Sequence, residues 1–562
     1  MLLPLAANSL RLALLPLLHL RHRTLVPKGS WVRVKLEGPL TELSPPAQRW
    51  LRAVRPQVSV AGLRMLAEAV AQDDHVAGVL FELRGVACGW ATAQSVRDVV
   101  GALRAAGKKT VAYLPFGAST REYHLAVACD TVLIAPQASL APLGVAAGST
   151  FLKGLLARGG IEAEVLARKE FKSAGESFSR DGFSEANRQQ LDALLDRFQG
   201  AFLQAISDGR RVDLDRARSL VDNGPYRPSD GVRDGLVDAL AYEDQVPSHL
   251  GPKGTKVVSA PVYLRLRRAL RFSPVLPAQR VGVVEVRGAI VPQSRYAFGS
   301  VADAERIVGA LRVARAVPRI GAVVLYVDSR GGSALASDVI AREVERVQEE
   351  KPVVAYFSDV AASGGYYVAA PTRAIVAQPT TVTGSIGVIA MRFLASGTLG
   401  LLGVGQETLR RGARADLMSP YRRWDEGDRA AVEREIDGFY NDFVATVARG
   451  RKRSPEDVEP VARGRVWAGS DARDVGLVDA LGGLDTAIAR ARELAGGRFH
   501  DDPVLISPPR NTPPPAELPS AMMAVLSSLA EQHGGVRALD ALQLALSSPH
   551  ERLFAFEDAD VG

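Results

Sequence analysis

The sequence predicts an α/β protein with largely parallel sheets, arranged as two tandem repeats. Two observations lead to this fold class: short apolar stretches alternate with helical stretches, and the second half of the chain repeats patterns of the first. The size agrees, because 562 residues are too many for one ordinary hydrophobic core. With 47% apolar and 23% charged residues, the composition is that of a globular chain.

The repeat has a nearly constant spacing along the chain. Matching residues such as Tyr123 and Tyr366 are separated by 243 positions. Further on, the run Gly-Leu-Val-Asp-Ala-Leu at 235–240 returns at 476–481. One such match is easily due to chance, but matches in the same order over much of both halves indicate a duplicated domain.

The second half shows the alternation of strands and helices most clearly. Short apolar runs predict buried strands, and the longer stretches between them predict helices. The predicted strands are 281–286, 321–327 and 353–357, and the predicted helices are 304–316, 334–350 and one that starts at Ser363. Strands that are separated by helices pair in parallel, so each repeat is expected to contain a mainly parallel sheet.

The chain divides into five predicted segments. They are an apolar N-terminal segment, a first repeat, a linker rich in Pro, Gly and Arg, a second repeat, and a tail: 1–29, 30–246, 247–279, 280–497 and 498–562. The tail opens with proline-rich sequence, which is typical of a stiff linker. A helical segment is predicted at 520–547, and the sequence assigns no function to it.

The N-terminal segment is rich in leucine but interrupted by polar residues. A spanning helix needs about 20 apolar residues with few or no charges. Residues 1–20 carry Asn8, Ser9, Arg11 and two prolines, so they fall short of that standard. Two interpretations stay open: a membrane-associated helix, or a helix packed on the protein's own core. A cleaved signal peptide is disfavoured, because no small-x-small site follows the apolar run.

Composition argues against several classes of function. The net charge is +7, but the basic residues are spread along the chain and no basic block appears, which disfavours nucleic-acid binding. The two cysteines, Cys88 and Cys129, lie in no metal-binding pattern, and free thiols are the simplest interpretation. No metal and no organic cofactor is predicted.

One serine occupies a position suited to nucleophilic catalysis. Ser363 follows an apolar strand, opens a helix, and is succeeded by Gly364 and Gly365. A helix start leaves unpaired N–H groups that favour a developing negative charge, which suits acyl transfer. A second pair, Gly331 and Gly332, follows another predicted strand and can direct N–H groups into a crevice as an oxyanion hole. Taken alone, both features also fit ordinary turns.

A serine nucleophile needs a base, and histidine is scarce. Residues 280–497 contain no histidine, so a triad would have to use His75 or His124 from the first half. Lysine is the other candidate, and Lys172 lies in the run Phe-Lys-Ser-Ala. Roughly one free lysine in 2,500 is neutral at pH 7, but burial can lower a lysine pKa by about 3–5 units. By itself, Lys172 is more simply a solvated charge, and Lys169 is an alternative.

Together these motifs resemble the signal peptide peptidase A (protease IV) family. The resemblance rests on Ser-Gly-Gly-Tyr-Tyr from Ser363, Thr-Gly-Ser-Ile-Gly around Ser385, and Phe-Lys-Ser-Ala around Lys172. It extends over about residues 30–495 and matches the long form of the family, in which two ClpP/crotonase-like domains are fused. The resemblance implies a Ser/Lys dyad: Ser363 as nucleophile, Lys172 as base and Ser385 orienting the lysine.

The resemblance also implies the oxyanion donors, the substrates and the surroundings. The N–H groups of Gly331 or Gly332 and of Gly364 would form the oxyanion hole, although Arg330 replaces the family's usual proline. Substrates would be remnant signal peptides and other apolar peptides. The family further implies a homotetramer at the bacterial cytoplasmic membrane, with its active domain outside the cytoplasm.

The two repeats are incomplete in complementary ways. Ser363 corresponds to Thr120, and Ser385 corresponds to Pro142, so the first repeat lacks the serines. Lys172 corresponds approximately to Ala415, so the second repeat lacks the lysine. This division favours one site built from both repeats, and the role of Thr120 stays open. The rival functions are a crotonase-like acyl-CoA enzyme and a non-catalytic membrane scaffold.

Overall fold

The structure, a computed structural model, describes residues 2–43, 58–270, 278–293, 296–297, 301–506, 516–517 and 553–556. The chain forms two compact units: Met1–Val145 with Asp196–Pro277, and Ala146–Leu195 with Ala278–Gly562. Helix α7 (Glu185–Arg210) contributes residues to both units. The predicted helix at 520–547 lies outside the described residues.

A parallel sheet forms the centre of the first unit. Its strand order is β8-β5-β3-β2-β1-β9, and every neighbouring pair is parallel. The strands are β1 (Ser30–Pro39), β2 (Val76–Ala87), β3 (Lys109–Leu114), β5 (Thr131–Ile134), β8 (Ala239–Leu240) and β9 (Val257–Ser259). A separate short pair joins β4 (Gly117–Ala118) to β6 (Ser139–Leu140).

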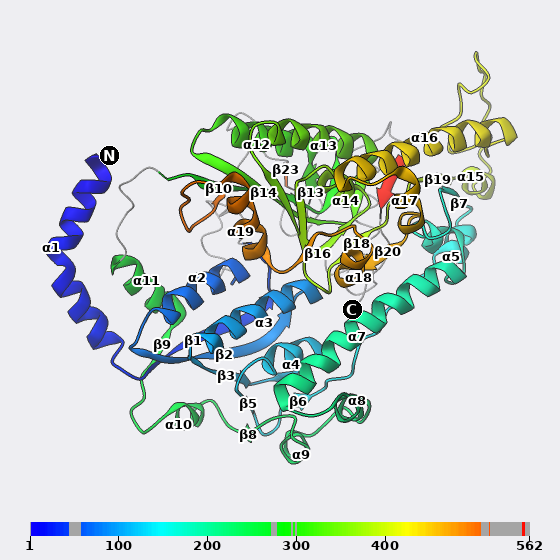
Figure 1. The fold of residues 1–562 in the computed structure, drawn as a ribbon. Coiled ribbons are helices and arrows are strands. Elements are labelled where there is room, and N and C mark those ends of the chain that lie inside the picture. Colours follow the sequence, from blue (N-terminus) through cyan, green and yellow to red (C-terminus); the bar gives the residue numbers. More distant parts are fainter. Residues whose placement is uncertain are drawn as a thin grey trace. The chain divides into compact units, whose positions relative to one another are not determined.

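Helices accompany this sheet, as the alternating pattern predicts (Figure 1). They are α1 (Leu2–Leu25), α2 (Val60–Ala71), α3 (Trp90–Ala105), α4 (Thr120–Ala126), α8 (Leu214–Asp222), α9 (Pro228–Arg233), α10 (Val246–Leu250) and α11 (Ala260–Leu270). The stretch between the repeats is therefore structured in part, because it supplies β9 and α11 to this unit. Helix α1 contacts α11, and the ring of His22 lies 6.5 Å from that of Tyr263.

The second unit has a larger central sheet. Its strand order is β20-β18-β16-β14-β10-β22, with β17 beside β16 and β21 beside β17. All pairs are parallel except β18 with β20. The strands are β10 (Arg280–Arg287), β14 (Ile320–Ser329), β16 (Val353–Ala362), β17 (Ala374–Ala377), β18 (Val382–Gly384), β20 (Val466–Ala468), β21 (Ala480–Leu481) and β22 (Val504–Leu505).

A second sheet of this unit has the order β13-β11-β15-β24-β19-β7. Its strands are short: β7 (Glu162–Ala167), β11 (Ala289–Val291), β13 (Val301–Asp303), β15 (Gly331–Ser333), β19 (Ile389–Leu394) and β24 (Leu553–Phe556). A further pair joins β12 (Tyr296–Ala297) to β23 (Ala516–Glu517). The segment 146–195 is thus tied into this unit, because β7 pairs with β19.

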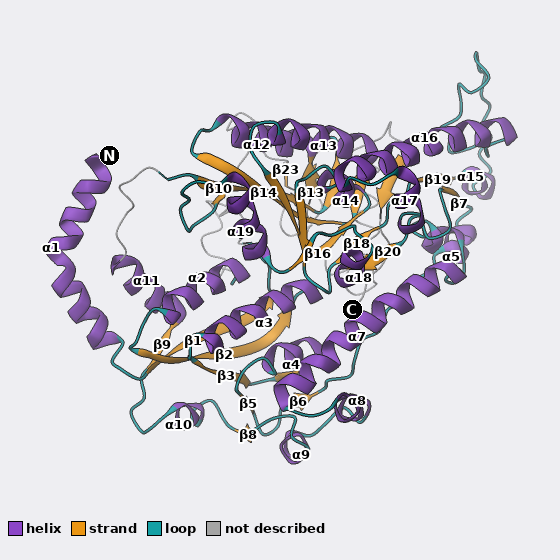
Figure 2. Ribbon diagram, viewed as in Figure 1, coloured by secondary structure: helices purple, strands orange, loops and turns teal. Residues whose placement is uncertain are grey.

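Helices cover both faces of the central sheet (Figure 2). They are α12 (Ala304–Ala316), α13 (Ala334–Gln348), α14 (Gly364–Ala369), α16 (Glu426–Arg451), α17 (Pro455–Val458), α18 (Gly469–Asp474) and α19 (Leu484–Ala495), and beside the second sheet α5 (Lys153–Arg158), α6 (Glu176–Ser179) and α15 (Ser396–Leu401). Alternate residues of β14 such as Val323 and Leu325 join the core under α12 and α13, and α19 packs on the opposite face.

The predicted elements and the duplication agree with this architecture. Helix α12 has its predicted bounds, α13 ends two residues early, and β16 continues five residues beyond its predicted end. The Tyr123 hydroxyl donates to the Leu236 carbonyl at 2.7 Å, and the Tyr366 hydroxyl donates to the Leu477 carbonyl at 2.8 Å. The same buried contact thus occurs once in each unit. The α/β fold class with largely parallel sheets is confirmed.

Candidate active site

Ser363 lies on a sharp turn between a strand and a helix. It joins β16 to α14 with φ +55° and ψ −120°, a conformation that is rare for residues other than glycine. Its N–H donates to the Gly384 carbonyl at 2.9 Å, and its carbonyl accepts from the Tyr367 N–H at 2.9 Å. Backbone contacts on both sides therefore hold the strained turn in place, as in strand-turn-helix sites that present a nucleophile.

A bulge in β16 precedes this turn. Val327 pairs with Phe357, but the next pair joins Ser329 to Ala361, so β16 contains two extra residues there. The Thr381 hydroxyl donates to the Ser358 carbonyl at 2.7 Å and fixes the bulge. Bulges redirect a strand, which explains why β16 continues past its predicted end. Ser363 therefore lies directly after the C-terminal end of β16.

The amine of Lys172 lies between two serine hydroxyls. Lys172 Nζ is 2.8 Å from Ser363 Oγ and 2.8 Å from Ser385 Oγ. It is also 3.2 Å from the Ser385 carbonyl oxygen. All three side chains are buried, with exposed fractions of 0% for both serines and 4% for Lys172. Three predicted site residues, far apart in the sequence, thus meet within hydrogen-bonding distance.

Lys172 belongs to the same compact unit as Ser363. In the sequence it lies in the first repeat, but the structure places the segment Ala146–Leu195 with the second unit. The pairing of β7 with β19 and the contacts of the lysine amine both lie inside that unit. The serine–lysine pair is therefore a feature of one unit, whereas the sequence favoured a site assembled between two repeats.

Two glycines leave room for the lysine chain. Gly464 has φ +79°, and a Cβ on it would lie 2.6 Å from the Lys172 nitrogen. A Cβ on Gly387 would lie 3.2 Å from Lys172 Cδ. Gly387 is part of the Thr-Gly-Ser-Ile-Gly motif. The sequence did not indicate Gly464, because the loop that contains it, two residues after Ala462, shows no recognisable motif.

A buried glutamine also fixes the lysine loop. Gln190 Nε2 donates to Ser173 Oγ at 3.0 Å and to the Phe171 carbonyl at 3.3 Å. Gln190 Oε1 accepts from the Val466 N–H at 3.2 Å. Gln190 has an exposed fraction of 0%, so its amide links both flanks of Lys172 to β20. Sequence reasoning missed this residue, because a glutamine within a helix gives no pattern that reveals a distant partner.

The predicted oxyanion glycines lie beside the serine. A Cβ on Gly364 would be 3.3 Å from both the Gly331 Cα and the Gly332 nitrogen. Gly331 and Gly332 have φ values of +103° and +154°, in the region that favours glycine. The Gly331 N–H donates to Ser329 Oγ at 3.1 Å. The structure brings all three glycines together, and the half-buried Arg330 precedes them.

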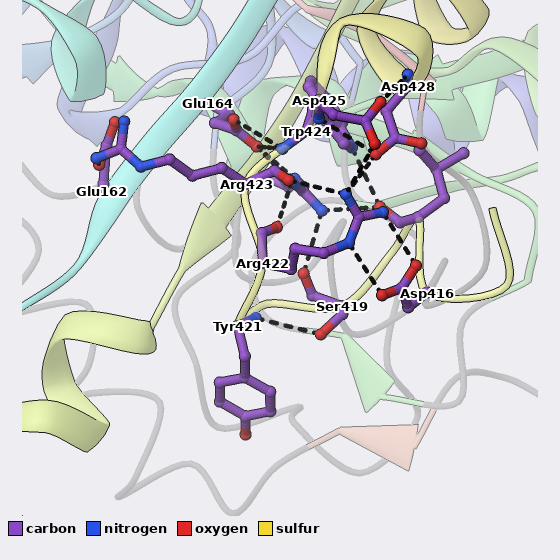
Figure 3. Close-up of polar contacts among 12 residues, drawn as sticks. Glu162, Glu164, Asp416, Ser419, Tyr421, Arg422, Arg423, Trp424, Asp425 and Asp428 are labelled. Carbon is purple, nitrogen blue, oxygen red and sulfur yellow. Dashed lines mark hydrogen bonds and ion pairs between the residues drawn. The ribbon is translucent and has the colours of Figure 1, made fainter. Parts of the chain in front are cut away.

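A buried ion pair anchors the strand that leads to Lys172, and its carboxylate, Glu164, lies beside Trp424 (Figure 3). Arg392 on β19 donates through Nε to Glu164 Oε2 on β7 at 2.8 Å, and both side chains are buried. The guanidinium also donates to the carbonyls of Leu417, Ser419 and Arg422, and it stacks 4.4 Å above the Trp424 ring. The pair therefore holds β7, β19 and the segment before α16 in one arrangement.

The first unit has lost the corresponding chemistry. Thr120, at the position of Ser363, uses its Oγ1 to accept the Leu143 N–H at 3.0 Å. Glu122 stands where the second unit has Gly365, and its carboxylate accepts from the Val86 N–H at 3.1 Å. A negative side chain thus occupies backbone donors in that loop. The described contacts thus give the Thr120 hydroxyl a structural partner.

His124 is packed in the interior of the first unit. Its ring lies 5.3 Å from Trp90 and 6.0 Å from Phe202, and burial holds the pKa of His124 well below its ordinary value. Cys88 and Cys129 are not joined in a disulfide. In the part of the chain that the structure describes, no three His, Cys, Asp or Glu residues cluster as metal ligands. Among the same residues, no helix has the length and apolar character needed to cross a bilayer.

A carboxylate pair lies close to the glycine loop. Asp328 is the penultimate residue of β14, and Asp359 lies in the β16 bulge. Burial, together with the Asp359 carboxylate, raises the pKa of Asp328 to about 6. The folded protein therefore holds this proton more tightly than the unfolded chain. Protonated Asp328 therefore stabilises the fold. This stabilisation is fully present at pH values below 3.8, the ordinary pKa of the group, and is lost as the pH rises through about 6.

The raised pKa of Asp328 gives a prediction for the substitution Asp328→Asn. The amide stays neutral, so we expect the variant to be more stable than the wild type at pH 8, by about 3 kcal/mol, because an ionised Asp328 destabilises the fold there. Below about pH 3 the two proteins should unfold alike, because Asp328 is then mostly protonated in both the folded and unfolded wild type. Urea unfolding of both proteins at the two pH values checks this, and an unchanged stability difference between them would contradict it.

Comparisons with known proteins identify the family of the chain. The model of peptidase family S49 matches residues 102–253 and 345–498. "Serine protease SPPA, chloroplastic" of Arabidopsis thaliana is 32% identical over 82% of this chain and 68% of its own length. "Protease 4" of Salmonella typhi is 30% identical over 86% and 82%. A mutant ClpP1 of Listeria monocytogenes aligns with 37% of this chain and 94% of its own, at 12% identity and a TM-score of 0.24.

The family model matches once in each half, which agrees with the duplication read from the sequence. The paired matches and the largely parallel sheets agree with the predicted α/β fold and its duplication. The resemblance to the signal peptide peptidase A family is confirmed as well, since relatives of that type cover most of the chain. The chain belongs to peptidase family S49 and is a serine-type peptidase.

Proposed function

We propose that this peptidase is a Ser/Lys dyad endopeptidase, with Ser363 as nucleophile, Lys172 as general base and Ser385 orienting the lysine. The observation that carries the proposal is the 2.8 Å contact between Lys172 Nζ and Ser363 Oγ in a buried site. A base must lie within about 2.6–3.2 Å of the proton that it takes. Burial favours the neutral amine, since removal from water disfavours the charged form.

The contacts of Lys172 match the hydrogen-bonding capacity of a neutral amine. Such an amine has two N–H donors and one lone pair. The donors would serve Ser385 Oγ and the Ser385 carbonyl, at 2.8 and 3.2 Å. The lone pair then faces the Ser363 hydroxyl, which donates its proton. Ser385 thereby acts as a positioning residue that aims the lone pair.

The proposed reaction is peptide-bond hydrolysis in two steps. Lys172 takes the Ser363 proton while Oγ attacks the scissile carbonyl carbon. The lysine then gives this proton to the leaving amine, and an acyl-enzyme remains. Water, deprotonated by the same lysine, hydrolyses the ester and restores Ser363. No metal or organic cofactor takes part in these steps.

The oxyanion hole is proposed at the N–H groups of Gly332 and Gly364. Both donors belong to backbone that approaches closely, because a Cβ on Gly364 would lie 3.3 Å from the Gly332 nitrogen. The Gly331 N–H already donates to Ser329 Oγ, which favours Gly332 of the two candidates. Fixed backbone donors of this kind need no reorganisation when negative charge develops.

The proposed substrates are remnant signal peptides and other apolar, extended peptides at a membrane. A peripheral membrane contact through α1 is supported by its exposed leucines, with exposed fractions of 63% for Leu12, 64% for Leu17 and 63% for Leu20. Arg21 and Arg23 follow them and suit an anionic surface. The proposed location is the bacterial cytoplasmic membrane, with the active domain outside the cytoplasm.

A homotetramer remains part of the proposal. Support comes from exposed aliphatic side chains in and after α15: Leu401, Leu402 and Leu409 have exposed fractions of 69%, 70% and 87%. Apolar side chains gathered on a surface mark interaction sites. A second copy of the chain is the partner that the family resemblance implies.

A fluorophosphonate probe tests the nucleophile directly. We expect Ser363 to be labelled, and both labelling and hydrolysis of an apolar peptide to be lost in Ser363→Ala, by at least about 10³-fold in kcat/KM. Ser358→Ala is a matched control, because it removes a buried serine hydroxyl from the same strand. Peptide hydrolysis that survives in Ser363→Ala would disprove the role of Ser363. Turnover of acyl-CoA by that variant would favour the crotonase-like alternative.

A further inference from the structure

The loop that carries the oxyanion glycines and the turn that carries Ser363 are in direct contact. Strand β14 leads into the first and β16 into the second, and Ser329 pairs with Ala361 just before them. A Cβ on Gly365 would lie 2.6 Å from the Ser329 carbonyl oxygen, so a side chain there would displace the backbone. The distance between the nucleophile and the oxyanion donors therefore depends on how the ends of β14 and β16 are joined.

The side chain of Asp328 joins these two strand ends. Asp328 is half-buried, and its carboxylate accepts the Val360 N–H from the bulge of β16. Val360 has no paired residue on β14, because the ladder between the two strands passes from Phe357 directly to Ala361. The carboxylate thus supplies a link between β14 and β16 at the place where the bulge interrupts their pairing.

The backbone of Asp328 is fixed from its other side by the residue that follows β10. The Asp328 carbonyl accepts the Gly288 N–H at 2.9 Å, and the Ser329 hydroxyl donates to the Gly288 carbonyl at 2.7 Å. The same hydroxyl accepts the Gly331 N–H at 3.1 Å. A continuous set of hydrogen bonds therefore runs from the Gly331 backbone through Asp328 to the bulge that precedes Ser363.

Charged groups of both signs surround the Asp328 carboxylate. They are Asp359 on β16, Arg287 and Glu285 on β10, and Arg330 in the glycine loop. Arg287 lies opposite Asp328 in the ladder between β10 and β14, and it pairs with Glu285 at 3.4 Å. These neighbours make the charge of Asp328 one of several in the cluster. The contact that belongs to Asp328 in particular is the hydrogen bond from Val360.

We propose that Asp328 is a positioning residue of the peptidase, whose carboxylate oxygen holds the oxyanion glycines in place beside Ser363 by accepting the Val360 N–H. The inference rests on the proposed function, because it concerns the geometry of the same site. Oxyanion donors must lie about 2.7–3.1 Å from the oxygen that becomes charged, and a displacement of about 1 Å can cost about a hundredfold in rate. Loss of the acceptor should therefore lower kcat and leave KM nearly unchanged.

Two substitutions that remove the acceptor test this inference in the full-length protein. Asp328→Ala and the bulkier Asp328→Leu should each lower kcat for an apolar fluorogenic peptide about tenfold or more, with KM within about twofold of the wild type. The rate of fluorophosphonate labelling should fall by the same factor as kcat. Asp328→Asn should keep kcat within about twofold, because its amide oxygen can accept the Val360 N–H.

The controls distinguish positioning from other roles. Glu285→Ala removes a carboxylate of the same cluster whose partner is Arg287 on β10, so kcat should not change. In Asp328→Ala, kcat/KM should still rise with pH as in the wild type, at a lower level throughout, because Lys172 remains the base. Urea unfolding identifies the variants that are folded at the assay temperature, and kcat is compared among those.

The outcomes separate this inference from the proposed function. Wild-type kcat in Asp328→Ala and Asp328→Leu would overturn the role of Asp328 and leave the dyad intact. An equal loss in Asp328→Asn would overturn it too, because the charge and not the acceptor would then matter. A raised KM at unchanged kcat would do the same, since it indicates weaker substrate binding. Absence of hydrolysis and labelling from the wild type would instead overturn the proposed function.

Discussion

Replacement of Lys172 by methionine is expected to lower kcat/KM by about 10³-fold or more, because a positioned general base contributes about 10²–10⁴ and the variant also loses its proton donor for the leaving amine. Methionine has a similar length and suits a buried position, so the fold should be retained. Lys172→Arg should be equally inactive, because a guanidinium stays charged and cannot accept the Ser363 proton. Hydrolysis of an apolar peptide and fluorophosphonate labelling both measure the loss.

Lys169→Met is the matched control for this prediction. Lys169 lies three residues away in the same loop, pairs with Glu459 Oε1 at 2.8 Å and is partly exposed. A partly exposed ion pair contributes little, so we expect its removal to change kcat/KM less than about threefold. Near-normal activity in Lys172→Met, or an equal loss in Lys169→Met, would show that another group takes the proton.

The pH profile distinguishes a base from a structural residue. If Lys172 acts as a neutral amine, kcat/KM of the wild type should rise with pH as the amine loses its proton. The residual activity of Lys172→Met should lack that rise, whereas a variant that only loosens the site would keep it. The comparison needs no assumption about how well either variant is packed.

Much of the site could be predicted from one sequence because its parts occur in short local patterns. Ser363 lies where an apolar strand meets a Gly-Gly pair, and Ser385 lies in a motif with two glycines. Lys172 was the harder case, since apart from the family resemblance of the run Phe-Lys-Ser-Ala a lysine in a loop is more simply a solvated charge. The duplication supplied further evidence for Lys172, because the first repeat lacks the serines and the second repeat lacks the lysine. The contact of 2.8 Å between Lys172 and Ser363 agrees with that reasoning.

The residues that the sequence did not indicate act through contacts between distant segments. Gly464 makes room for Lys172 across 292 positions of the chain, and Gln190 links Ser173 to Val466. Neither shows a periodic or motif-like pattern nearby. The packing of 146–195 with the second unit was also unforeseen, because the repeat aligns this segment with the first half and gives no information about pairing between β7 and β19.

That pairing leads to the second large expected effect. Arg392→Met should destabilise the second unit by about 3–5 kcal/mol, because it leaves the Glu164 carboxylate buried without its charged partner. It also removes the donors for three carbonyls before α16. Because β7 precedes the Lys172 loop, we expect kcat to fall along with stability. Urea unfolding and peptide hydrolysis measure the two effects.

The double variant Arg392→Met/Glu164→Leu separates the charge from the packing. Replacing a whole buried ion pair by apolar side chains is often close to neutral, so the double variant should be more stable than Arg392→Met alone. Recovery should be partial, since Glu164 also accepts the Trp424 N–H at 3.2 Å. Arg490→Met is the control: its exposed pair with Glu493 in the same unit should contribute less than about 1 kcal/mol. If Arg392→Met were no more destabilising than Arg490→Met, the pair would not hold β7 to β19, and the lysine loop would depend on Gln190 and Gly464 instead.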